Sequence, residues 1–69
     1  MSDGLPPTAA AIRAAERRLQ HCRLQDRIAL RLLQENTNDR TITDYRTARH
    51  ATDDAEHALN LLLDAWEAQ

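Results

Sequence analysis

The chain has 69 residues, a formal net charge of −2 and one cysteine. A chain of this length forms a single small domain, which buries only about 60% of the surface that the unfolded chain exposes. One cysteine excludes an internal disulfide, so association with a partner is the expected source of further stability. The slightly negative charge gives no general attraction to nucleic acid or anionic membranes, and no apolar run approaches the roughly 20 residues of a membrane span.

The composition predicts an all-α fold. Ala and Leu dominate the apolar residues, and Phe and Val are absent. Few β-branched residues and many Ala, Leu, Arg and Glu favour helices over strands. Gly4, Pro6 and Pro7 are the only glycine and prolines, so nothing after Thr8 breaks a helix by its backbone chemistry. The N-terminus shows no secretory signal, and a cytoplasmic location is therefore expected.

In chain order, residues 1–7 are expected to form a flexible leader, followed by one helical hairpin over residues 8–69. The first helix is predicted over about residues 8–35, since proline is tolerated in a first helical turn. Residues 36–41 are predicted to form a turn rich in Asn, Asp and Thr. Thr41 and Asp44 resemble a capping box, so the second helix is predicted over about residues 42–67.

Both predicted helices carry a stripe of residues spaced alternately by three and four. The first stripe consists of Ile12, Ala15, Leu19, Cys22, Asp26, Ala29 and Leu33. The second consists of Tyr45, Ala48, Thr52, Ala55, Leu59, Leu62 and Trp66. Each stripe is a heptad seam of about six turns, and two seams joined by a short turn pair antiparallel. The expected neighbours across the seam are Leu33 with Tyr45, Asp26 with Thr52, Leu19 with Leu59 and Ile12 with Trp66.

Asp26 occupies a seam position where an apolar residue is expected. A buried carboxylate is costly unless it is hydrogen-bonded or paired with a charge. We therefore expect Thr52 or Arg49 to satisfy Asp26 and so to fix the register of the hairpin. No second acid, base or nucleophile accompanies Asp26, and we expect no catalytic site.

A second apolar row lies away from the seam and predicts a protein-binding surface. In the first helix it comprises Leu24, Ile28 and Leu32, at a spacing of four. In the second helix Leu61 lies off the seam, together with Ala51, Ala58 and Ala65. A hairpin has one internal interface, so this row would be exposed in a monomer, and contiguous exposed apolar surface marks an interaction site.

Two groups of polar residues are candidate sites. Arg13, Arg17, Arg27 and Arg31 form a stripe that could contact RNA or DNA, but no aromatic residue interleaves it. We interpret this stripe as a solvated face that pairs with the acidic second helix.

His50, Asp53, Asp54 and His57 form an exposed cluster whose histidines lie two turns apart, too far for one metal ion to bind both. We expect no metal, no cofactor and an inert Cys22 in the core.

The second helix resembles the small needle co-chaperones of bacterial type III secretion, the YscE and PscE family. The resemblance rests on Tyr45 and on the segment Glu56-His57-Ala58-Leu59-Asn60-Leu61-Leu62, about a third of the chain. It implies a two-helix hairpin that binds a helical-repeat chaperone and, with it, keeps the needle subunit unpolymerised in the cytoplasm. Leu24, Ile28, Leu32 and Leu61 would then contact the chaperone.

The sequence thus predicts a protein-binding helical hairpin without enzymatic activity, and the resemblance specifies a type III secretion co-chaperone. The alternative is a homodimeric four-helix bundle that binds or regulates RNA or DNA through the arginine stripe. The partner is accordingly either a helical-repeat chaperone with its needle subunit or a second copy of the chain. Nucleic acid is the less favoured partner, and no membrane contact is expected.

Overall fold

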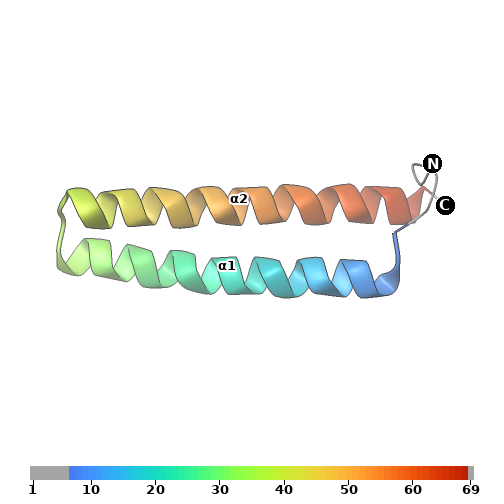
Figure 1. Ribbon diagram of the computed structural model, residues 1–69, viewed down its shortest axis with the longest axis horizontal. Helices are drawn as coiled ribbons and strands as arrows, with labels where there is room; N and C mark the ends of the chain where they lie inside the picture. The colour runs from blue at the N-terminus through green and yellow to red at the C-terminus, as the bar shows by residue number, and fades with distance from the viewer. Residues whose placement is uncertain (1–6, 69) are drawn as a thin grey trace.

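The computed structural model describes residues 7–68 and consists of two long helices that lie side by side and antiparallel (Figure 1). Helix α1 spans Ala9–Glu35 and helix α2 spans Asp39–Glu67. The predicted all-α hairpin is therefore confirmed. The leader predicted over residues 1–7 lies outside the described residues except for Pro7.

Helix α1 begins at a threonine cap. The Thr8 backbone is extended, and its Oγ1 accepts a hydrogen bond from the backbone N–H of Ala11 at 3.1 Å. This bond satisfies one of the N–H groups that the first helical turn leaves without a partner. The helix therefore starts at Ala9, directly after the predicted first residue.

Helix α2 begins at Asp39, three residues before the predicted Ile42. Asn38 is the cap, because its Oδ1 accepts from the N–H of Thr41 and its own N–H donates to Thr41 Oγ1, both at 3.0 Å. The prediction that Thr41 and Asp44 cap the helix was wrong: Thr41 is the third residue of the helix and the other half of the box that Asn38 opens.

The connection between the helices is consequently three residues long, from Asn36 to Asn38, instead of six. Two hydroxyl groups bond this connection to both helices. The Thr37 hydroxyl donates to the carbonyl of Leu33 in α1 at 2.8 Å, and the Thr41 hydroxyl of α2 donates to the carbonyl of Asn36 at 2.7 Å. No described residue has a positive φ, so the turn closes without glycine.

The two predicted seams form the helix–helix interface. Each seam residue is buried or half-buried except Trp66, which stays 45% exposed in the last turn of α2. Only one turn of α1 extends beyond Ile12 towards this end, so little of the neighbouring helix is available to cover the indole.

Very little of the molecule is truly buried. Among the described residues, the buried apolar side chains are Leu19 and Ala55, and the buried polar ones are Asp26 and Thr52. The molecule is a rod of 48 × 19 × 16 Å with a radius of gyration of 15.5 Å, against about 11 Å for a compact domain of this length. A rod of two helices has one internal interface, and so most side chains face outwards.

Candidate functional site

A polar layer crosses the middle of the seam. Arg49 Nη1 of α2 donates to Asp26 Oδ2 of α1 at 2.9 Å, and Arg49 Nη2 lies 3.7 Å from Asp53 Oδ1. The Asp26 side chain is almost covered, whereas about half of the Arg49 side chain remains in solvent. The hydrogen bond from Arg49 to Asp26, and then the nearby charge of Asp53, raise the pKa of the Arg49 guanidinium above its usual value.

Thr52 forms the next part of this layer. It is the most completely buried polar side chain, and its hydroxyl lies 3.1 Å from the carbonyl oxygen of Cys22 and 3.0 Å from that of Ala48. The sequence left two partners open for Asp26. In the structure Arg49 bonds to Asp26, and Thr52 instead reaches Cys22, one turn earlier in α1. Every buried side-chain nitrogen and oxygen in the described chain has a hydrogen-bond partner.

Beside the seam, each helix carries a second ladder with the same alternating spacing. On α1 it comprises Ala14, Arg18, His21, Gln25, Ile28 and Leu32. On α2 it comprises Thr47, Ala51, Asp54, Ala58, Leu61 and Ala65, and one step before Thr47 lies Asp44. Ile28, Leu32 and Asp44 line one common hollow, so the two ladders border the same side of the hairpin. We call this side the outer face.

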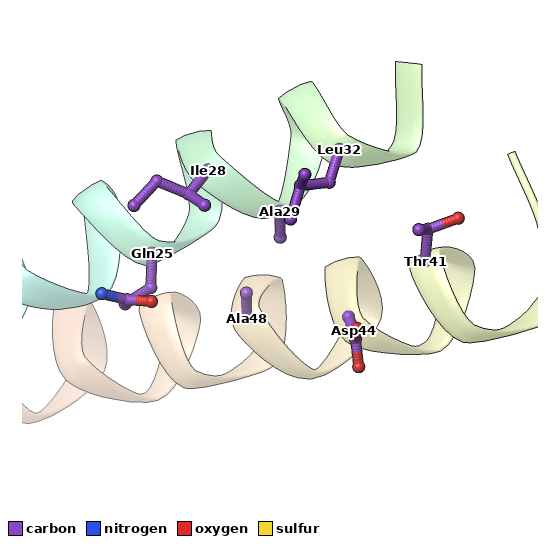
Figure 2. A pocket seen from close by; sticks show the side chains of 7 residues that line it. All are labelled: Gln25, Ile28, Ala29, Leu32, Thr41, Asp44 and Ala48. Carbon is purple, nitrogen blue, oxygen red and sulfur yellow. The ribbon is translucent and has the colours of Figure 1, made fainter. Parts of the chain in front are cut away.

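The hollow lies at the turn end of the outer face and has a volume of about 240 Å³. Figure 2 shows Gln25, Ile28, Ala29 and Leu32 projecting from α1 beside Thr41, Asp44 and Ala48 of α2. Ala29 and Ala48 are the small seam residues that form its floor, and the larger Ile28 and Leu32 form one wall. Small residues in the seam therefore leave a depression that an apolar side chain from another molecule could fill.

The four residues predicted to bind protein are all half-exposed: Leu24 is 49%, Ile28 45%, Leu32 50% and Leu61 56% exposed. Ile28 and Leu32 line the hollow, and Leu61 belongs to the outer face nearer the open end. Leu24 lies farther round α1, directly opposite the seam, at the border between the outer face and the arginine stripe.

Sequence reasoning missed the other residues of the hollow, Gln25, Ala29, Thr41, Asp44 and Ala48. Gln25, Ile28 and Leu32 follow the seam's own spacing of three and four, displaced to one side. The spacing of this second ladder indicates which residues share one side of the helix. An apolar pattern alone does not reveal it, because its members include polar residues as well as apolar ones.

The arginine stripe does not pair with α2, contrary to the expectation. Arg13, Arg17, Arg27 and Arg31 are all exposed, and in the part of the chain that the structure describes the only ion pair that involves one of them joins Arg31 to Glu35 within α1 at 3.5 Å. Within residues 7–68, the one ion pair between the helices runs the other way, from an arginine of α2 to an aspartate of α1. The stripe points away from the seam, and so its side chains do not reach the acidic helix.

The described part of the chain contains no group of three or more His, Cys, Asp or Glu placed to hold a metal ion. Cys22 is a free, half-buried thiol at the seam. Neither described helix is long and apolar enough to cross a membrane. Comparisons with known protein families, curated proteins and solved structures found no match to this chain.

Proposed function

We propose that this chain is a protein-binding helical hairpin whose outer face docks onto another protein. The observation that carries the proposal is a set of about half-exposed apolar side chains on the outer face, Ile28 and Leu32 at the turn end and Leu61 nearer the open end, in a rod whose described residues include two buried apolar side chains. Side chains of this kind on one face mark interaction surfaces.

The surface area supports the same proposal. The accessible surface is 5493 Å², compared with about 4,400 Å² for a compact monomer of 7.9 kDa. A rod of two helices has more surface than a compact monomer of the same mass, and a standard protein interface buries roughly 800 Å² of each partner. Covering the outer face would thus give the chain the burial that its own fold does not provide.

The resemblance of α2 to type III secretion co-chaperones specifies the partner that we propose. In this role the hairpin would bind a helical-repeat chaperone in the cytoplasm, and together they would keep a needle subunit unpolymerised. A half-exposed apolar row on a rigid hairpin suits this task, because helical-repeat proteins offer concave surfaces into which a helix pair can pack.

The test is co-purification of the tagged chain with a helical-repeat chaperone and a needle subunit from the same genome. Ile28→Asp should abolish the complex, because it places a charge in the apolar contact. The matched control is Leu30→Asp, on the same helix and two residues away, which points to the opposite side of the hairpin. Retention of the chaperone by Ile28→Asp, with helicity unchanged by circular dichroism, would contradict the proposal.

One observation favours a second candidate, RNA or DNA binding through the arginine stripe. Arg13, Arg17 and Arg27 are exposed and form no ion pair within the described chain, so their charges are available to phosphate groups. This function requires retention on nucleic acid that weakens steeply with salt. Arg17→Glu with Arg27→Glu should remove that retention and leave the outer-face complex intact.

A further inference from the structure

The charges of the two helices are strongly unequal. Helix α1 carries six Arg and three acidic residues, whereas α2 carries three Arg and seven acidic residues. Within the described hairpin one ion pair joins the two helices, and it makes no use of this difference because it joins an acid of α1 to an arginine of α2. The remaining ion pairs lie within single helices. The attraction between a basic α1 and an acidic α2 is therefore still available to another molecule.

The outer face presents the two kinds of charge side by side. Arg18 and His21 lie on its α1 ladder, and Asp54 lies on its α2 ladder. The bonds from Thr52 to Cys22 and from Arg49 to Asp26 place residue 54 at the level of residue 21 along the rod. His21 and Asp54 thus lie at the same level on either side of the seam near the middle of the face, and Arg18 lies one helical turn away on the same ladder.

We propose that, when no other protein occupies the outer face, a second copy of this chain covers it and the two hairpins form a four-helix bundle. The two-fold axis runs parallel to the long axis of the hairpin, so that α1 of each copy packs against α2 of the other. The inference rests on the proposed function only in that both use the outer face. The self-complex would be the form of the hairpin when no other protein occupies that face.

This arrangement places the positive charge of Arg18 within one helical turn of the negative charge of Asp54 of the second copy, and His21 lies at the level of that Asp54. The two-fold axis repeats the contact. Every helix then has two antiparallel neighbours of opposite net charge, which is favourable both for the side-chain charges and for the helix dipoles.

The residue sizes fit the same arrangement. Gln25 lies level with Ala51 of the second copy, Ile28 with Thr47, and Leu61 with Ala14, so that a large side chain faces a smaller one in these three layers. Interlocking of large and small side chains allows facing helices to approach closely. The two-fold axis makes each contact occur twice, as a self-complementary interface requires.

The opposite orientation, with the turn of one hairpin at the open end of the other, places α1 on α1 and α2 on α2. Two helices with a surplus of arginine would then be neighbours, as would two helices with a surplus of acids. Like charges at an interface disfavour association, so the charge distribution selects the orientation in which the two turns lie at the same end.

Sedimentation of the full chain at increasing concentration tests whether the dimer forms. We expect a monomer–dimer equilibrium, and we expect Ile28→Asp to raise its dissociation constant about 100-fold, since each dimer loses two buried isoleucines. Leu30→Asp, the matched control, should leave the dissociation constant within a few-fold of the parent. A chain that remains monomeric at millimolar concentration would overturn the inference.

Cysteine cross-linking tests the orientation in the full chain with Cys22→Ser. A Gln25→Cys variant and an Ala51→Cys variant are oxidised separately and as an equal mixture. We expect the mixture to form a disulfide-linked heterodimer and each variant alone to form far less linked product. No excess of heterodimer in the mixture would overturn the orientation.

These outcomes separate the two proposals. A monomeric chain that still retains the chaperone overturns the self-complex and leaves the proposed function standing. A dimer in the predicted orientation that retains no chaperone overturns the co-chaperone role and leaves the self-complex standing.

Discussion

At the scale of single residues, the polar layer of the seam differs most from an ideal helical interface. Asp26 is 8% and Thr52 1% exposed, whereas their apolar neighbours along the seam are mostly only half-buried. A hydrogen-bonded polar group in an interface stabilises one register, because a slip of one turn would leave that group without its partner. We therefore infer that this layer fixes the register of the two helices more than it adds to overall stability.

The ion pair predicts an asymmetry between two substitutions. Arg49→Met leaves the carboxylate of Asp26 buried and unpaired, whereas Asp26→Leu leaves a half-exposed guanidinium that water can solvate. Arg49→Met should therefore lower the free energy of unfolding by clearly more than Asp26→Leu does. Urea denaturation of both variants measures the difference, and equal losses would argue against this account of the pair.

The substitution Thr52→Val measures how much the buried hydroxyl contributes to the stability of the hairpin. The substitution keeps the side-chain shape but removes the group that lies within hydrogen-bond distance of the carbonyls of Cys22 and Ala48. The free energy of unfolding should fall by about 1 kcal/mol, measured by urea denaturation. Thr43→Val, at an exposed position of the same helix, is the control and should have little effect.

At the scale of the elements, the helices and their seams were predictable from the sequence. Long alternation of three and four, together with the absence of helix breakers after Thr8, leaves few alternatives to an antiparallel pair. The start of α2 was not predictable from the same rules, because Asn38 and Thr41 are both good capping residues. Only the reciprocal bonds between them identify Asn38 as the cap and shorten the turn to three residues.

The cap itself gives a prediction. Asn38→Ala removes the acceptor for the Thr41 N–H at the start of α2 and should cost about 1 kcal/mol of stability. Thr43→Ala, in the next turn, has no capping role and serves as the control. Thermal denaturation followed by circular dichroism compares the two, and an Asn38→Ala variant as stable as the parent would show that the turn is held by Thr37 and Thr41 alone.

The candidate site was predicted in part. Leu24, Ile28, Leu32 and Leu61 were named from their distance to the seam, and all four are half-exposed. The pattern of each helix alone does not show which of these residues share one face of the hairpin. That depends on the handedness of the hairpin, which determines which side of α1 lies beside which side of α2. The structure groups Ile28 and Leu32 with Asp44 around one hollow, and it leaves Leu24 at the border of the face.

At the scale of the whole molecule, the protein is a rod with little core of its own. Among residues 7–68 it buries two apolar side chains, Leu19 and Ala55, and our proposal that the hairpin binds another protein starts from this small core. The residues that carry the proposed protein binding are half-exposed apolar side chains on two paired helices.

The most direct test of this account is thiol labelling of the outer face in living cells. In a Cys22→Ser background, Leu32→Cys places a thiol on the outer face, and Gln20→Cys places one on the exposed arginine side of the same helix. If another protein or a second copy covers the outer face, a membrane-permeant maleimide should label the residue-32 thiol much more slowly than the residue-20 thiol. Equal labelling rates in the cell, at the normal expression level, would contradict the account.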